Sequence, residues 1–290
     1  DMKYIRSYYY SYDALKDMEG AMNTWYMSGN CSTMGYLSSK TDYKWFLPSA
    51  GQLSMLKANS YEVQRALEYL DSKGKNVKLL NGNMYWTSSE KSKDYAYTIS
   101  GNGELAGTYK PYYADFKLIY KFKVENDGYP YRVGDKIKNA DGEEGVLCYI
   151  SPDRKTGWMV AYNDLEGYYR YGYVDNNYVS KPTTDSWSDY ARVFASQDGY
   201  DNTTTMRRSS VADDLVAHAV DYEKGWYVPT VGQMQMIYAE RYLIEDALKS
   251  KGGSWLKTKG DEPVTYITST AYEYSSPVVY TLPNGKIKEE

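Results

Sequence analysis

The chain has 290 residues, a formal net charge of −4, and apolar and charged fractions of 42% and 25%. This length favours two domains, the composition excludes wholesale disorder, and the scattered Lys and Arg residues argue against nucleic acid as a partner. No segment approaches the roughly 18 consecutive apolar residues of a membrane span, and the N-terminal residues lack a signal-peptide core, so we expect a soluble chain without membrane insertion.

An internal repeat organises the chain. Residues 44–53 (KWFLPSAGQL) match residues 225–234 (GWYVPTVGQM), and residues 85–89 (YWTSS) match residues 266–270 (YITST) at the same offset of 181. A weaker match relates Gly20, Asn23 and Thr24 to Gly199, Asn202 and Thr203. The repeat predicts an α+β fold of two tandem modules, residues 1–128 and 129–290, each with a small, mostly antiparallel sheet and one or two helices.

In the first module, Ser49 and Gln52 form a capping box, which predicts the start of a helix. Apolar residues then recur with helical spacing from Val63 to Leu70, before Lys73-Gly74 ends the pattern. Residues 84–88 and 95–99 read as strands, and Asn102-Gly103 predicts a hairpin turn. Residues 116–124 alternate apolar and mostly Lys side chains, so we expect a strand that closes the sheet.

The second module opens with a predicted hairpin of residues 144–150 and 158–162. A helix is expected over residues 211–222, a second capping box at Thr230 and Gln233, and a strand at 278–282. We expect Trp45 and Trp226 to be buried beside the two helix starts. Module two has no counterpart of the strand 116–124, and module one has none of the hairpin. Either the chain is a trimmed part of a longer repeat array, or neighbouring segments fill the incomplete ends. We favour compensation within the chain, with residues 1–12 as candidates for module one, or self-association.

No set of residues has the spacing of a catalytic or metal site. Cys31 and Cys148 lie too far apart in sequence for a metal motif, and Cys148 lies in an apolar segment typical of a buried free thiol. His218, on the predicted helix 211–222, has no sequence-adjacent nucleophile. The carboxylates at 141–144 and 213–214 lack the spacing of a calcium loop. We therefore expect no enzyme activity, no cofactor and no metal.

Tyrosine is the one strong departure in composition, with 36 Tyr against four Phe. Tyrosines beside Ser, Gly and Asn are typical of binding surfaces, because the ring contributes contact area at low entropic cost. The alternative is that many of them replace Phe in and around the core. The candidate ligand-binding residues are Tyr112, Tyr113, Tyr168, Tyr169, Arg170, Tyr171, Tyr173, Tyr272 and Tyr274.

Several segments together resemble a known family: GWMVAYND at 157–164, ASQDGYDNT at 195–203, GWYVPTVGQM, then YITSTAY at 266–272 and VVYTLPNG at 278–285. The chain is similar to Bacteroidetes surface proteins with C-type-lectin-like domains related in fold to the formylglycine-generating enzyme. The likeness covers residues 131–290 and, in shorter form, 13–124. That enzyme depends on a pair of reactive cysteines, and module two has only Cys148.

The resemblance implies a compact α+β fold that presents a ligand-binding surface on an exported protein. We accordingly expect a non-catalytic, extracellular or outer-surface protein whose Tyr-rich loops engage a protein or glycan. The alternative is a structural subunit of a surface appendage, fimbria-like, without a small-molecule ligand.

Overall fold

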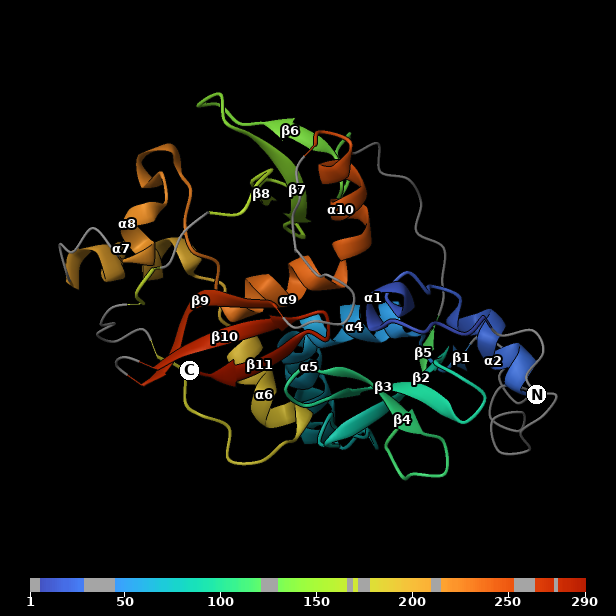
Figure 1. Cartoon of the computed structure of the whole chain (residues 1–290). Helices are drawn as coiled ribbons and strands as arrows, with labels where there is room; N and C mark the ends of the chain where they lie inside the picture. The colour runs from blue at the N-terminus through green and yellow to red at the C-terminus, as the bar shows by residue number, and fades with distance from the viewer. Residues whose placement is uncertain are drawn as a thin grey trace. The chain divides into compact units, whose positions relative to one another are not determined.

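The computed structural model describes residues 6–28, 45–120, 130–165, 169–171, 178–209, 215–252, 264–273 and 276–290. The chain divides into two compact units (Figure 1). Unit 1 comprises Asp1–Tyr129 and Thr184–Tyr190, and unit 2 comprises Pro130–Thr183 and Ala191–Glu290. The main division lies beside the expected boundary, but the return of residues 184–190 to unit 1 was not expected. Both units combine helices with small antiparallel sheets, as the α+β prediction requires.

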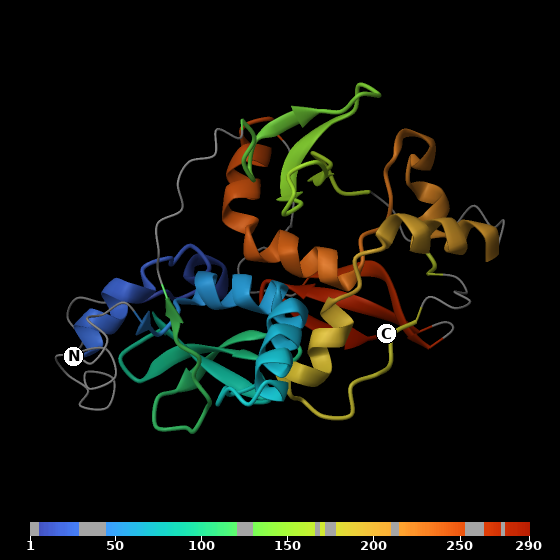
Figure 2. The ribbon, with the colours of Figure 1, turned by 180° about the vertical axis from the view of Figure 1, so that it is seen from behind.

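Unit 1 is built on the three-stranded antiparallel sheet β2-β3-β4. Helix α4 packs against β2 and β3, and α5 follows α4 after a one-residue break (Figures 1 and 2). The predicted hairpin at Asn102-Gly103 is present, with Gly103 at φ 87° and Ile99 opposite Leu105. The elements of this part of the chain are α1 (Ser11–Ala14), α2 (Gly20–Ser28), β1 (Trp45–Phe46), α4 (Ala50–Ala58), α5 (Ser60–Ser72), β2 (Met84–Glu90), β3 (Tyr95–Ser100), β4 (Leu105–Tyr109) and β5 (Ile119–Tyr120).

Unit 2 contains a matching sheet, β9-β10-β11, and a second sheet, β6-β7-β8, that includes the predicted hairpin. Helix α9 packs against β9, β10 and β7, and α10 packs against β7. The first turn of α6 belongs to unit 1 and the rest to unit 2. The elements are β6 (Lys136–Lys138), β7 (Glu144–Ile150), β8 (Gly157–Val160), α6 (Trp187–Phe194), α7 (Gly199–Ser209), α8 (Val216–Ala219), the 3-10 turn η1 (Tyr222–Lys224), α9 (Val231–Ala239), α10 (Arg241–Lys249), β9 (Val264–Glu273), β10 (Ser276–Leu282) and β11 (Lys286–Glu289).

Both predicted capping boxes are confirmed. The backbone N–H of Ser49 donates to Gln52 Oε1 at 3.1 Å, and that of Thr230 donates to Gln233 Oε1 at 3.0 Å. Each box satisfies donors that the first helical turn leaves without partners, which explains why α4 and α9 begin at equivalent positions.

The prediction that both repeated tryptophans are buried is wrong for Trp45, whose side chain is 45% exposed on β1. Trp226 is half-buried, and its indole N–H donates to Glu143 Oε2 at 2.8 Å. The buried residues beside the helix starts are instead Leu47 and Val228, at 4% exposure each. Successive strand residues face opposite sides, so burying Phe46 on β1 turns the neighbouring Trp45 outward.

The expected closing strand of unit 1 is also wrong. Ile119–Tyr120 pairs with β1 in a separate two-stranded sheet, and β11 gives unit 2 a third strand equivalent to β4, so both repeated sheets have the same strand set. Residues 121–124 lie outside the described part of the chain. The alternation of apolar residues predicts a strand but not the strand with which it pairs, because pairing is set by tertiary contacts.

Short backbone bridges cover the outer edges of β2 and β9. Ser7 bridges Glu90 and Asp115 bridges Tyr85 on β2, while Tyr178 bridges Ala271 on β9. Of the described residues among 1–12, Ser7 bridges β2, but no hairpin-like substitute for β7 and β8 is formed there.

Of the helix expected over residues 211–222, only Val216–Ala219 is α-helical among the described residues. Leu215 instead bridges the backbone of Arg170, and residues 211–214 lie outside the described chain. The apolar spacing that suggested a longer helix around His218 reflects burial of Leu215 on a backbone bridge and of Val216 and Ala217 in the short helix α8.

Candidate functional site

Residues that repeat between the units form a buried hydrogen-bond network in each. The Thr24 hydroxyl donates to the Gly20 carbonyl at 2.8 Å and accepts from the Leu47 N–H at 3.1 Å. In unit 2, Thr203 donates to Gly199 at 2.8 Å and accepts from Val228 at 3.0 Å. The matching motifs thus join α2 to the segment that precedes α4, and α7 to the segment that precedes α9.

The same network continues from the helix starts to the sheet. Ser89 Oγ accepts from the Ala50 N–H at 2.8 Å, and Thr270 Oγ1 accepts from the Val231 N–H at 3.1 Å. Buried polar groups are costly unless they are hydrogen-bonded, so these repeated Ser and Thr residues hold the fold together. Their repetition is explained by these shared structural hydrogen bonds.

Lys57 departs from this pattern, because its counterpart in unit 2 is Tyr238. The Lys57 side chain is completely buried, with Nζ 4.5 Å from the centre of the Trp187 ring and 6.0 Å from that of Tyr190. Burial holds the pKa of the Lys57 amine well below its ordinary value of 10.5.

Trp187 comes from the segment that returns to unit 1. Its backbone N–H donates to the Gly82 carbonyl at 3.0 Å, and its indole N–H donates to the Ile99 carbonyl at 3.1 Å. The ring meets Tyr85 edge-on at 4.7 Å between centres. These contacts fix the ring over Lys57 and enclose the amine.

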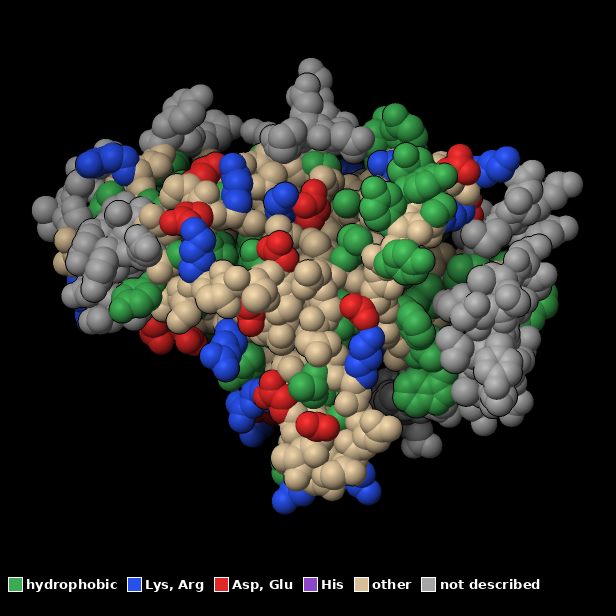
Figure 3. Space-filling view, turned by 90° about the horizontal axis from the view of Figure 1, so that it is seen from below, with side chains coloured by type: hydrophobic (Ala, Val, Ile, Leu, Met, Phe, Trp, Pro, Cys, Tyr) green, Lys and Arg blue, Asp and Glu red, His purple; other side chains and the backbone are tan. Residues whose placement is uncertain are grey.

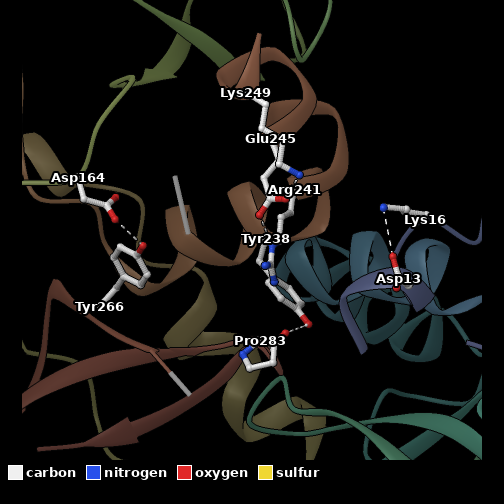
Figure 4. Close-up of polar contacts among 9 residues, drawn as sticks. All are labelled: Asp13, Lys16, Asp164, Tyr238, Arg241, Glu245, Lys249, Tyr266 and Pro283. Atoms are coloured by element: carbon white, nitrogen blue, oxygen red, sulfur yellow. Dashed lines mark hydrogen bonds and ion pairs between the residues drawn. The ribbon is translucent and has the colours of Figure 1, made fainter. Parts of the chain in front are cut away.

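Unit 2 uses different polar groups in the matching helices (Figure 4). Tyr238 donates its hydroxyl to the Pro283 carbonyl at 2.8 Å, and the buried Arg241 pairs with Glu245 at 3.0 Å, with Lys249 3.5 Å from the other carboxylate oxygen. Tyr266 donates to Asp164 at 2.9 Å. These contacts neutralise buried charge and satisfy hydroxyl groups, as structural pairs do.

Exposed tyrosines gather at one end of the unit 1 sheet. We call Tyr95, Tyr109, Tyr112 and Tyr113 the tyrosine ridge; their exposed fractions are 44%, 45%, 67% and 99%. The rings of Tyr95 and Tyr109 lie 5.6 Å apart between centres, and those of Tyr109 and Tyr112 lie 6.4 Å apart. Figure 3 shows hydrophobic side chains gathered in a band over the part of unit 1 that carries β3 and β4.

Local backbone structure positions the ridge. Tyr95 and Tyr109 are direct cross-strand partners on β3 and β4, which brings their side chains together on one face. After β4 the chain turns, and the Tyr112 N–H donates to the Tyr109 carbonyl at 2.9 Å. Lys110, beside the ridge, pairs with Glu90 at 3.5 Å. The ridge therefore stands on a paired hairpin and a hydrogen-bonded turn.

Two of the candidate residues from the sequence, Tyr112 and Tyr113, lie on this ridge. Tyr95 and Tyr109 were missed, although the predicted hairpin at Asn102-Gly103 already implied that these two tyrosines face each other.

The other candidates are not gathered at the ridge. Tyr171 and Tyr272 are buried at 8% and 6% exposure, and Tyr171 lies in a core cluster against which Tyr169 packs. Burial raises the pKa of Tyr171, which marks a core position rather than a contact surface. Arg170 is exposed. Tyr168, Tyr173 and Tyr274 lie outside the described residues.

Within the described ranges, no group of three His, Cys, Asp or Glu side chains is arranged to hold a metal ion. Cys148 is a buried free thiol, and burial raises its pKa to about 12; Cys31 lies outside those ranges. No described helix is long and apolar enough to cross a membrane.

Comparisons of the chain with protein-family models, with curated proteins and with solved structures found no match.

Proposed function

We propose that this protein is a non-catalytic binding protein of the cell surface or extracellular space, whose tyrosine ridge engages a protein or glycan. In this proposal two tandem C-type-lectin-like modules form the scaffold, and no cofactor is needed. The observation that carries it is the ridge itself: four exposed tyrosines on one end of a sheet, three of them in ring contact.

The chemistry of the ridge suits recognition. Tyrosine offers an apolar face and a hydroxyl while ordering few rotatable bonds, so binding costs little side-chain entropy. Contacts among Tyr95, Tyr109 and Tyr112 restrict the rings further before a ligand arrives, which lowers the entropic cost of binding.

Ring orientation favours a protein over a glycan. The planes of Tyr95 and Tyr109 differ by 53°, and those of Tyr109 and Tyr112 differ by 74°. A sugar chain stacking on successive rings needs them to present parallel faces. Tilted rings instead present faces, edges and hydroxyls to a surface with relief, as aromatic residues do at protein interfaces.

The test is to probe glycan and protein arrays with the purified chain and with a Tyr109→Ser/Tyr112→Ser/Tyr113→Ser variant. Interface aromatics often contribute about 2 kcal/mol or more each, so we expect at least a tenfold loss of affinity for the retained ligand. The matched control is Tyr69→Ser on α5, a tyrosine 63% exposed outside the ridge. Absence of a ligand on both arrays, or equal binding by the ridge variant, would contradict the proposal.

A further inference from the structure

Helix α1 contacts strand β4, but no described strand lies on the outer edge of β4. Strand β4 pairs with β3 on one side, and no other described strand pairs with it. The Lys110 N–H donates to the Asp94 carbonyl and the Ser100 N–H donates to the Glu104 carbonyl. Because hydrogen-bonding direction alternates along an antiparallel pair, the backbone groups of Leu105, Gly107 and Tyr109 point away from β3.

The other outer edges of the two repeated sheets are covered or charged. Chain segments bridge β2 at Tyr85 and Glu90 and bridge β9 at Ala271. Strand β11, the counterpart of β4, has the sequence KIKE, and Glu289 forms an ion pair with Lys181. Charges on an edge strand oppose pairing with another chain. Strand β4, with the sequence LAGTY, has no charged residue.

The β4 sequence is complementary to itself in one antiparallel register. When two copies pair about Gly107, Leu105 of each faces Tyr109 of the other, and the small Ala106 faces Thr108. The same register sets Glu104 opposite Lys110 of the second copy, so opposite charges meet at both ends of the strand.

We propose that β4 is a self-association edge, at which a second copy of this chain adds its own β4 antiparallel and centred on Gly107. The pairing joins two three-stranded sheets across a twofold axis. Because the same surface is used on both copies, the contact closes as a dimer and does not propagate into a filament. This inference does not require the ligand proposed for the ridge, but Tyr109 belongs to both the ridge and this edge.

The test measures the mass of the full-length chain over a wide concentration range by sedimentation. We expect a concentration-dependent dimer for the wild type, with slowed amide exchange in β4 on dimerisation. Glu104→Lys alone and Lys110→Glu alone each place like charges opposite one another, and each is expected to raise the dimer dissociation constant about tenfold. Lys110→Glu also removes the ion pair with Glu90 of its own chain, so the stability of each variant is measured by urea unfolding as well.

Mixing the two variants tests the register itself. The Glu104→Lys chain carries two lysines and the Lys110→Glu chain two glutamates, so a mixed pair restores opposite charges at both ends and is expected to dimerise as the wild type does. Circular dichroism checks that each variant is folded. A wild type that stays monomeric throughout, or a mixture that associates no better than the separate variants, would overturn the proposal.

Discussion

Replacing Lys57 by Met is expected to stabilise unit 1 at neutral pH. The amine is fully buried beneath Trp187, and burial lowers its pKa. Met keeps a long unbranched chain but removes the group whose charge is costly to desolvate. Desolvation of a buried ammonium costs several kcal/mol, and a desolvated contact with an aromatic ring returns about 2 kcal/mol. We therefore expect the free energy of unfolding to rise by about 2 kcal/mol.

The pH dependence of stability gives an independent check on the direction of the Lys57→Met effect. A lysine whose pKa is lowered in the folded state binds fewer protons there than in the unfolded state, so stability rises with pH between the lowered pKa and 10.5. The slope for one group is at most about 1.4 kcal/mol per pH unit. The advantage of Lys57→Met is accordingly largest at low pH and shrinks as the pH approaches 10.5.

The free energy of unfolding of the wild type and of the Lys57→Met variant is measured in urea, from neutral pH to below pH 10. Unfolding is followed by amide hydrogen exchange in β2 and β3, because these strands report on unit 1. Lys75→Met, at an exposed position after α5, is the matched control and is expected to change stability by less than about 0.5 kcal/mol. A Lys57→Met chain that is less stable than the wild type, with an unchanged pH slope, would refute the reasoning and assign a net stabilising role to the charged amine.

Three further results are expected. Gly232→Ala should lower stability by about 1–3 kcal/mol in urea unfolding, because a Cβ there would lie 2.2 Å from the carbonyl oxygens of Phe194 and Ser196; a neutral result would mean that the contact relaxes freely. Thr203→Val should cost about 1–3 kcal/mol by the same assay, since the buried Val228 N–H loses its acceptor, and an unchanged midpoint would contradict that accounting. In a Cys31→Ser background, mass spectrometry should detect alkylation of Cys148 only as urea unfolds the chain, because burial raises the thiol pKa to about 12; rapid modification of the folded chain would contradict the burial.

Local signals in the sequence predicted local structure well. The capping boxes at Ser49 and Thr230 and the turn at Asn102-Gly103 depend on atoms a few residues apart, so the sequence alone identifies them. The repeat correctly anticipated matching helices and sheets because the same buried hydrogen bonds recur in both units.

The misses arise where distant segments decide the outcome. The Trp187 side chain lies in a polar stretch, SWSDY, with no apolar periodicity, and its burial depends on Lys57 and Tyr85 far away in sequence. Trp45 was expected to be buried because it belongs to the repeated motif beside the helix start, but alternation on β1 turns its side chain outward. Tyr95 and Tyr109 of the ridge could have been found from the predicted hairpin, because extending its strand pairing from Tyr97 to Tyr95 places Tyr95 opposite Tyr109.

The return of residues 184–190 to unit 1 bears on where the chain can be divided. In a simple tandem arrangement each copy is one continuous segment of the chain. Here a deletion that removed everything after residue 129 would also remove the indole that covers Lys57 and meets Tyr85. A fragment that ends at residue 129 is therefore an incomplete unit 1, although it contains the whole of the first repeat.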